Sequence, residues 1–518
     1  MKDNAFLKGT LILIICNLIG KVLGAVYRIP LASIVGGEGM GQYQLTFPLY
    51  CLILTIATSG IPVAISKIVA ELNSKQNFAT SKKLLKISLL ILTIISVVSA
   101  AIVALGAKAI SSWQGNPSIY ICYYAISPAI LFVGILSAFR GFFQGNLLMY
   151  PTAISGLIEQ IIKLFVGLFL AKKFLVYGTE YAVFGAILGV SISELVACLY
   201  LAVNYFIFTR KNKCVIESEI LNGRLLSKKL MSVAIPITLG GMIAPLTSMI
   251  DSLLVVNLLM FDGFSSYAAT TLLGLQSGIV EPLVNIPVII AVSISTALLP
   301  SLSGLAEKKK TKEIKSLIFR SFEIALSIAA TCFVCFIIFG KQMLTFLYSS
   351  SLGAYELSIA TKLLFLGGIN IIFLSLVQVS SGVLQGLSHQ KYPVLSLLIG
   401  CVIKIALDFA LILIPQINIF GAVFAAGVCY IVVFALNYRK ITKLTGIKLA
   451  PAFGHIVIQQ FFVCSFAYFL NKLFLPLFGS TISLFAAGII TGIIFLVTFY
   501  LLFLQKRNLS CYTKPEKI

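Results

Sequence analysis

The chain has 518 residues, of which 59% are hydrophobic and only 11% are charged, and apolar stretches of about 20 residues, long enough to cross a bilayer core, recur from end to end. Its formal net charge of +22 is carried by basic residues scattered over many short loops, which argues against nucleic acid as a partner. This composition excludes a water-soluble domain and indicates an all-α polytopic membrane protein.

Breaks at Gly, Pro, Asn and charge clusters divide the apolar stretches into about fourteen predicted transmembrane helices. In chain order these helices cover residues 6–35, 42–71, 84–106, 119–145, 151–171, 181–209, 230–260, 267–303, 317–340, 358–386, 393–414, 418–438, 452–475 and 480–504. The expected parts are a six-helix lobe over 1–209, a cytoplasmic linker over 210–229, a second six-helix lobe over 230–438, a C-terminal helix pair within 439–504 and a cytoplasmic tail over 505–518.

The distribution of Lys and Arg predicts the orientation of these helices. Basic residues concentrate in the segments on the side of the two termini, whereas the opposite loops hold only Lys108, Lys172, Lys173, Lys341 and Lys472. Positive residues favour the cytoplasmic side of a membrane protein. We therefore expect both termini in the cytoplasm.

The first predicted helix carries two cations on one stripe. Asn17, Lys21, Gly24 and Arg28 follow one another at steps of four, three and four residues, and the glycine allows another group to approach closely. Charged side chains are costly inside a bilayer and commonly face a water-filled cavity. The alternative is that both side chains extend to the lipid headgroups, which suits Arg28 better than Lys21 near mid-span.

Further charges fall on the fourth and fifth predicted helices. Arg140 lies one turn before Gln144, and Glu159 forms an i, i+4 pair with Lys163. The interior of the first half is therefore expected to be cationic. We interpret Arg140, Glu159 and Lys163 as substrate-binding residues, together with the two cations of the first helix. For Glu159 and Lys163 an internal salt bridge remains the alternative role.

Acidic residues are more prominent in the second half. Asp251 lies on the seventh predicted helix, Glu281 on the eighth, and Lys404 with Asp408 on the eleventh. We expect Asp251, Lys404 and Asp408 to share an interior ion-coupling site suited to a cation or a proton. The alternative is a buried cluster that only locks two helices together. Glu281 is assigned to the substrate-binding set.

A stretch of the chain occurs twice at a nearly constant offset. An internal duplication in so hydrophobic a chain is typical of a transporter built of two related halves, with its site where they meet. The elements Gln144-Gly145, Tyr150-Pro151 and Lys163 reappear as Gln385-Gly386, Tyr392-Pro393 and Lys404.

The Cys and His residues give no sign of enzyme chemistry. Most of the eleven cysteines fall inside apolar spans, where Cys behaves as a small hydrophobe. Cys332 and Cys335 have CxxC spacing, but no second pair and no ligand His lies nearby in the sequence. His389 and His455 accompany no nucleophile motif. We therefore expect a protein that is not an enzyme and that has no metal and no cofactor, apart from sodium or a proton as a coupling ion.

Several motifs along the chain are similar to those of a known family. They are Phe6-Leu-Lys-Gly-Thr, Lys21-Val-Leu-Gly, Ile34-Val-Gly-Gly-Glu-Gly39, the run Ser59-Gly-Ile-Pro-Val-Ala-Ile-Ser-Lys67-Ile-Val-Ala-Glu71 and Arg140-Gly-Phe-Phe-Gln-Gly145. With these motifs the whole chain resembles the stage V sporulation protein B and polysaccharide biosynthesis protein family. That family belongs to the superfamily of multidrug, oligosaccharidyl-lipid and polysaccharide (MOP) exporters and is similar to the MurJ-type lipid II flippases.

The resemblance implies a fold and a cargo. The fold would have two six-helix lobes around a V-shaped cavity that alternates access, plus a helix pair with a groove for a lipid tail. The cargo would be a polyprenyl-diphosphate-linked glycan, flipped across the cell membrane for peptidoglycan, spore-cortex or polysaccharide synthesis. Membrane lipids and cell-wall synthesis enzymes would be the partners. Lys21 stands at a basic position of the flippases, and Arg28 is at or beside the next one.

The chain departs from the flippase pattern at two positions. Glu281 stands where the flippases carry an essential arginine, so the resemblance does not imply the same diphosphate clamp. Lys404 stands where they carry the asparagine of a sodium site, whose aspartates correspond to Asp251 and Asp408. A lysine ammonium at that position can itself take the place of the cation.

We predict a lipid-linked oligosaccharide flippase, because a diphosphate needs several cations in a polar cavity. One alternative is a cation-coupled multidrug antiporter of the same fold, which would need an acidic, aromatic-lined cavity. Another is a membrane-embedded glycan polymerase, which would need acid and base residues on sizeable external loops. A purely structural scaffold would not explain the buried charges.

Overall fold

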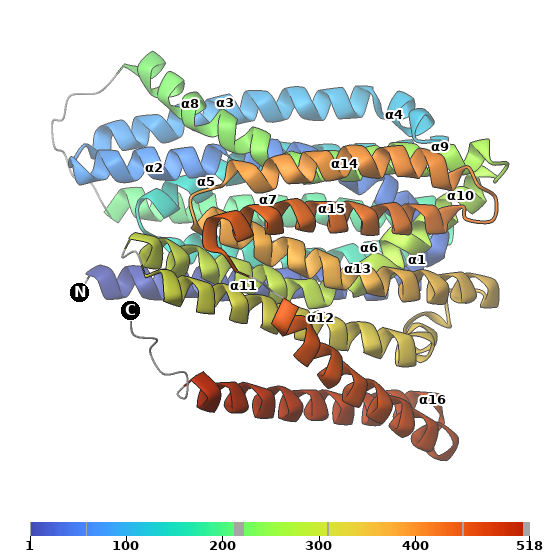
Figure 1. Ribbon diagram of the computed structural model, residues 1–518. Helices are drawn as coiled ribbons and strands as arrows, with labels where there is room; N and C mark the ends of the chain where they lie inside the picture. Colours follow the sequence, from blue (N-terminus) through green and yellow to red (C-terminus); the bar gives the residue numbers. More distant parts are fainter. Residues whose placement is uncertain (1, 59, 212–221, 308–309, 448–449, 511–518) are drawn as a thin grey trace. The chain divides into compact units, whose positions relative to one another are not determined.

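The computed structural model describes residues 2–58, 60–211, 222–307, 310–447 and 450–510. Across these ranges the chain forms helices joined by short turns and contains no β-strand (Figure 1). Ten of the described helices are long and apolar enough to cross a membrane, and two shorter apolar helices add to them. The predicted all-α fold is therefore confirmed, and the chain is a multi-pass membrane protein.

The chain divides into two compact units. The first unit comprises Met1–Pro282 and Ile405–Ala422, and the second comprises Leu283–Lys404 and Val423–Ile518. The lobe boundaries drawn from the sequence at 209 and 230 stay a prediction.

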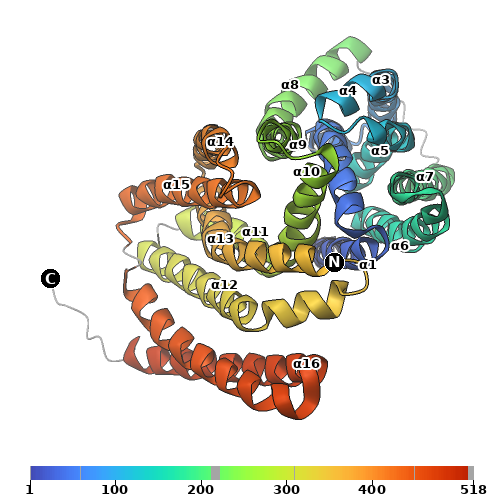
Figure 2. The ribbon, with the colours of Figure 1, turned by 90° about the vertical axis from the view of Figure 1, so that its right-hand side faces the viewer.

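The first unit contains most of the N-terminal helices. They are α1 (Lys2–Thr58), α2 (Ile61–Ser74), α3 (Phe78–Leu105), α4 (Ala107–Trp113), α5 (Tyr120–Gly145), α6 (Met149–Phe174), α7 (Thr179–Lys211), α8 (Gly223–Gly241), α9 (Ile243–Phe261), α10 (Ser266–Leu273) and the π-helix η3 (Gly274–Val280), with two short 3₁₀ turns, η1 (Pro117–Ile119) and η2 (Leu175–Tyr177). Within this unit α1 packs against α5, α6 and α7 (Figure 2).

The second unit is built mainly from the remaining helices. They are α11 (Glu281–Glu307), α12 (Thr311–Tyr348), α13 (Ala354–Gly386), α14 (Lys391–Ile412), α15 (Ile419–Thr445) and α16 (Ala450–Ser510). The division between the units falls within α14, after Lys404. α16 consists of two legs (Figure 2), which correspond to the predicted C-terminal pair, and Gln459 of one leg reaches Thr498 of the other at 3.5 Å. This pair packs on α12, where Gln342 donates to Asn471 at 2.9 Å.

The first two predicted helices are joined at a kink inside α1. Gly36 has φ 67° and ψ −169°, a backbone conformation outside the helical region that a residue with a side chain rarely adopts. The break falls between the predicted spans 6–35 and 42–71. The glycine-rich stretch in the sequence therefore marks a real change of helix direction.

The duplicated sequence forms the same helix contact in both units. In the first, α5 lies so close to α2 that a Cβ added at Gly141 would meet the backbone of Pro62 at 2.8 Å. In the second, α13 approaches α11 in the same way, because a Cβ at Gly382 would lie 2.9 Å from the Cα of Ser295. Small residues permit such close helix packing in membrane proteins. The repeat is therefore present in the structure as well as in the sequence.

The turn that follows this helix is also repeated. After α5, Leu147 has φ 60° and Leu148 N–H donates to the Phe143 carbonyl at 2.9 Å. After α13, Ser388 has φ 65° and His389 N–H donates to the Leu384 carbonyl at 2.8 Å. Both turns thus end their helix with the same left-handed residue and the same closing bond. α6 and α14 therefore follow equivalent turns.

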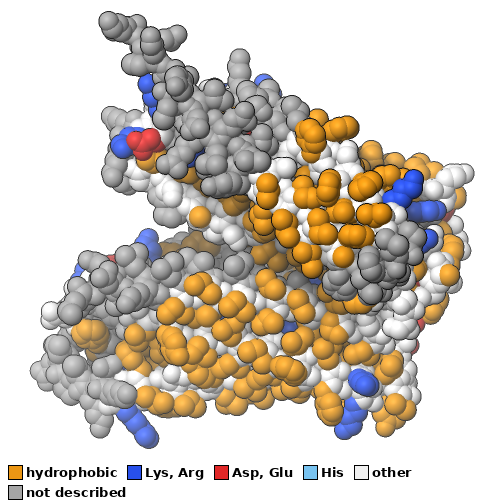
Figure 3. Space-filling view, turned by 90° about the horizontal axis from the view of Figure 1, so that it is seen from below, with side chains coloured by type: hydrophobic (Ala, Val, Ile, Leu, Met, Phe, Trp, Pro, Cys, Tyr) orange, Lys and Arg blue, Asp and Glu red, His pale blue; other side chains and the backbone are white. Residues whose placement is uncertain are grey.

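Many large apolar side chains are exposed on the described surface, as a bilayer requires. Figure 3 shows hydrophobic side chains spread over the visible face, with the few Lys and Arg side chains near its margins. One leg of α16 exposes a run of aromatic side chains, Phe461, Phe462, Phe466 and Phe469. Exposed apolar area of this extent suits contact with lipid.

Candidate functional site

Arg140 and Glu159 form an ion pair between α5 and α6 in the first unit. The Arg140 Nη2 atom lies 3.1 Å from Glu159 Oε2, and both side chains keep about a fifth of their surface exposed, at 21% and 19%. Arg140 Nε also donates to Ser155 Oγ at 3.1 Å, and Gln160 Nε2 donates to Glu159 Oε1 at 2.9 Å. The arginine charge is therefore largely matched inside this group.

Lys163 lies one turn further along α6, among aromatic rings. Its Nζ atom is 5.2 Å from the centroid of the Tyr27 ring and 5.0 Å from that of the Phe47 ring, both on α1. Cations are attracted to aromatic faces at such distances. Among the described residues Lys163 forms no ion pair, because the structure pairs Glu159 with Arg140 instead. The i, i+4 salt bridge considered as an alternative is thus replaced by an ion pair between helices.

Glu194 brings a further carboxyl group to this region from α7. Its side chain is buried, with 3% of the residue exposed, and Tyr50 O–H of α1 donates to its Oε1 at 2.9 Å. Its Oε2 atom is buried and has no hydrogen-bond partner among the described residues. Lys163 and Arg140 are close enough to interact with it electrostatically. We call Arg140, Glu159, Lys163 and Glu194 the unit 1 charge cluster.

The wall of this cluster on α1 is aromatic. Tyr43 and Phe47 stack with ring centroids 5.0 Å apart, and Phe47 lies 5.6 Å from Tyr50. These residues follow the kink at steps of four and three, which places them on one helical face. Residues of α1 on both sides of the kink, Tyr27 and Phe47, thus give the charge cluster an aromatic side.

The other predicted site residues are less fully defined. Lys21 lies on α1, but its side chain is outside the described part of the structure. Arg28 is partly exposed on α1 and close enough to Lys163 to interact with it electrostatically. Glu281 is exposed at the start of α11. The substrate roles assigned to these residues stay predictions.

The predicted ion-coupling residues lie on α9 and α14. Asp251 is partly buried on α9, whereas Lys404 and Asp408 are buried one turn apart on α14. Lys404 falls in the second unit and the two aspartates in the first. Their grouping into one coupling site stays a prediction.

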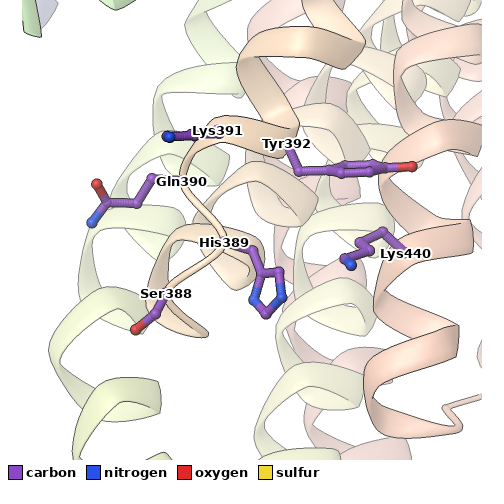
Figure 4. Close-up of a pocket in the computed structure, with 6 residues that line it drawn as sticks. All are labelled: Ser388, His389, Gln390, Lys391, Tyr392 and Lys440. Atoms are coloured by element: carbon purple, nitrogen blue, oxygen red, sulfur yellow. The ribbon is translucent and has the colours of Figure 1, made fainter. Parts of the chain in front are cut away.

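A pocket of about 370 Å³ lies at the repeated turn of the second unit. It is lined by Ser388, His389, Gln390, Lys391, Tyr392 and Lys440, of which two are lysines. Figure 4 shows His389 and Lys440 on the same side of the turn, while Lys391 and Gln390 extend away. Lys440 Nζ lies 5.6 Å from the Tyr392 ring, and His389 Nδ1 lies 2.8 Å from the Leu387 carbonyl. The pocket is open at a turn and lacks the buried acids of the unit 1 charge cluster.

The sequence profile of the polysaccharide biosynthesis protein family matches residues 6–306, more than half of the chain. The chain belongs to this family. A second profile, MatE, matches residues 236–410. The family member is 30% identical over 469 residues to stage V sporulation protein B of Bacillus subtilis (strain 168), covering 89% of each chain. It is also 30% identical to lipid II flippase MurJ of the same organism, covering 86% of this chain and 84% of the relative.

Solved transporter structures share the fold of this family member. A lipid II flippase MurJ in an inward closed conformation superimposes with a TM-score of 0.73 at 14% identity, covering 96% of this chain and all of that one. An inward-facing multidrug resistance MATE family transporter gives 0.64 at 14% identity, covering 83% of this chain and 96% of that one. Together with the relatives, these structures confirm a transporter fold of the MOP superfamily.

Glu194 and the aromatic face of α1 were missed in the sequence of this family member. The available signal for Glu194 was a single acid after Ser191 and Ser193 in an otherwise apolar span. The aromatic face was visible only as Tyr43, Phe47 and Tyr50 at helical spacing, which is also the pattern of an ordinary buried helix. Its proximity to Lys163 depends on how α1 packs on α6, which spacing along one helix does not reveal.

Proposed function

We propose that this protein flips a polyprenyl-diphosphate-linked glycan, of the lipid II type, across the cell membrane by alternating access. The cargo class comes from the relatives, one of which is named as a lipid II flippase. The observation in this chain that carries the proposal is the position of Lys163 against two aromatic rings, without an ion pair among the described residues.

An ammonium group without an ion-pair partner is costly in a membrane segment, and such groups usually serve an ion or substrate path. Arg140 is matched by Glu159, so it contributes less net positive charge than Lys163 does. Lys163 and the nearby Arg28 are therefore the groups that would attract the diphosphate. Phosphate oxygens accept charge-assisted hydrogen bonds from such cations.

The partial pairing within the cluster suits a transporter. A site that held the diphosphate with every cation at full strength would bind it too tightly to release it. Glu159 and Glu194 moderate the positive charge around Lys163, so the attraction stays limited. The Tyr27 and Phe47 rings keep the ammonium in place between transport cycles.

This role also implies where the protein works and what it supplies. The protein lies in the plasma membrane with both termini in the cytoplasm, and it supplies peptidoglycan, spore-cortex or polysaccharide synthesis. It acts as a transporter without covalent catalysis. The cell-wall enzymes that use the flipped glycan would be its functional partners.

A multidrug antiporter of the same fold is the second candidate, favoured by the MatE profile over residues 236–410. The two candidates differ in their cargo, because an antiporter for cationic drugs does not need Lys163.

The test is an assay of lipid II in the outer leaflet of cells depleted of their own flippase and expressing this chain. We expect outer-leaflet lipid II to be restored, with no efflux of ethidium from the same cells. Ethidium efflux without lipid II translocation would establish the antiporter instead.

A further inference from the structure

Glu194 places a carboxyl group inside the first unit with few partners. Its Oε1 accepts one hydrogen bond, from Tyr50 at 2.9 Å. Its Oε2 is buried and, within the described ranges, accepts none. A carboxylate that is removed from water without a full set of hydrogen bonds is costly. Such a group is stable only when a nearby cation balances its charge or a bound proton neutralises it.

The titratable groups that interact electrostatically with Glu194 come from four helices. They are Tyr50 of α1, Arg140 of α5, Glu159 and Lys163 of α6, and Cys198 of α7 itself. Arg140 already pairs with Glu159. Lys163 is therefore the remaining cation that can balance the charge of Glu194. Lys163 is also the residue proposed to bind the diphosphate of the cargo.

A metal ion does not fit this position. Among the described residues there is no group of three or more His, Cys, Asp or Glu side chains that could hold one. Lys163 and Arg140 would also repel a metal cation, whereas a proton is taken up by the carboxyl oxygen itself and needs no further ligands.

We propose that Glu194 is a proton-binding site that controls whether Lys163 is available to the anionic cargo, an inference that rests on the proposed function. When Glu194 is deprotonated, its carboxylate attracts the Lys163 ammonium and competes with the diphosphate. When a proton binds to Glu194, the carboxyl group is neutral and Lys163 is left for the phosphate oxygens. The Tyr50 hydroxyl holds the carboxyl group in place in both states.

This arrangement links proton binding to cargo binding. If a proton on Glu194 strengthens cargo binding by some factor, cargo must strengthen proton binding by the same factor. Cargo binding thus takes up a proton, and cargo release returns it.

The first test examines the proton site without any cargo. We would record infrared difference spectra of the full-length protein in nanodiscs between acidic and alkaline buffer. Other Asp and Glu side chains also titrate in this range, so the Glu194 band is the component of the C=O absorption of protonated carboxylic acids that wild type should show and Glu194→Gln should lack. It should move to higher wavenumber in Tyr50→Phe, which removes the hydrogen bond to Oε1. Glu180→Gln, at the far end of α7, is the matched control and should leave the band unchanged.

If Glu194→Gln gave the same C=O absorption as wild type, or if Tyr50→Phe did, the proton site would be overturned. Because Tyr50→Phe retains the carboxyl group and removes only a hydroxyl, the test stands even where Glu194→Gln lowers the yield of folded protein.

The second test examines the link to cargo. Undecaprenyl diphosphate would be added to the purified protein in weak buffer containing a pH indicator. We expect uptake of up to about one proton per bound lipid, the limit for one linked site. Glu194→Gln should bind the lipid without this uptake. Equal uptake by wild type and variant would overturn the link.

The two tests separate failure of this inference from failure of the proposed function. If wild type does not bind undecaprenyl diphosphate, the proposed function and the cargo link both fail, and the infrared band still decides whether Glu194 binds a proton. If wild type restores outer-leaflet lipid II but shows no Glu194 band, the flippase function stands and the proton site is wrong.

Discussion

Lys163 and Lys404 occupy equivalent places in the two halves of the duplication but have opposite surroundings along their helices. On α6 the residue one turn before Lys163 is the acid Glu159, and one turn after it is Gly167. On α14 the order is reversed, with Gly400 before Lys404 and Asp408 after it. The duplicated helix has therefore kept its lysine and moved its acid by two turns.

The two lysines also differ in how they are packed. Lys163 is partly buried and lies against the Tyr27 and Phe47 rings of α1. Lys404 is buried, with 8% of the residue exposed, on the same helix as the buried Asp408. We infer that the lysine of the first half was kept for an anionic cargo. For the lysine of the second half, the predicted role in ion coupling stays a prediction.

The largest effect is expected from removing the lysine of the first half. Lys163→Met keeps the apolar stem and deletes the charge, so lipid II flipping should fall by about ten- to a hundredfold, the equivalent of one charge-assisted hydrogen bond of roughly 1.5–3 kcal/mol. Outer-leaflet lipid II in flippase-depleted cells measures it. Lys173→Met, at the exposed end of α6, is the matched control. Equal losses in the two variants would remove the special role of Lys163.

The lysine of the second half should instead affect coupling. Lys404→Asn gives the Asn-x-x-x-Asp pattern of the flippases that the sequence resembles, and we expect flipping to become dependent on sodium. Flipping at several sodium concentrations, together with protein abundance, measures this change. A variant that is poorly folded and does not respond to sodium would identify Lys404 as part of a helix lock.

The ion pair of the first half can be tested by breaking it from each side. Glu159→Gln leaves Arg140 without its carboxylate, and Arg140→Gln leaves Glu159 without its guanidinium. Breaking a fully buried pair costs about 3–5 kcal/mol, and partial exposure of both side chains reduces this cost to roughly 1–2 kcal/mol. Thermal unfolding in detergent measures the loss. The double variant should recover part of it; strictly additive losses would mean that the two residues do not interact.

The smallest effects concern the repeated helix contact. Gly141→Ala and Gly382→Ala should each destabilise the protein by about 1–3 kcal/mol, because the new Cβ meets a neighbouring helix in either unit. Gly156→Ala on α6 is the control, since nothing lies within 4 Å of its added Cβ. It should stabilise slightly, by about 0.5–1 kcal/mol. Thermal unfolding of the three variants measures these changes. A loss of stability in only one of Gly141→Ala and Gly382→Ala would contradict the repeated contact.

The sequence predicted the fold well because hydrophobic length and breaks determine it. The kink at Gly36 and the paired turns at Leu147 and Ser388 coincide with glycine-rich or repeated segments. The helix ends were less accurate, since several helices continue beyond the apolar core into polar residues. α12, for example, runs over Thr311–Tyr348, whereas hydropathy predicted 317–340.

The candidate site could be predicted only in part. Arg140, Glu159 and Lys163 were identified as charges that are costly in a membrane, and the structure brings them together. Their pairing was not predictable, because an i, i+4 rule compares residues on one helix, whereas Glu159 pairs across to α5. Glu194 was missed for the same reason, because its place in the site depends on a hydrogen bond from Tyr50, which lies on another helix.

The most direct test of the account is the affinity of the purified protein for undecaprenyl diphosphate, measured for wild type, Lys163→Met, Lys163→Arg and Lys173→Met. We predict that Lys163→Met binds the lipid at least about tenfold more weakly, the value of one charge-assisted hydrogen bond to phosphate. Lys163→Arg should retain most of the affinity, and Lys173→Met should equal wild type. Unchanged affinity in Lys163→Met would contradict the assignment of the unit 1 charge cluster to the anionic cargo.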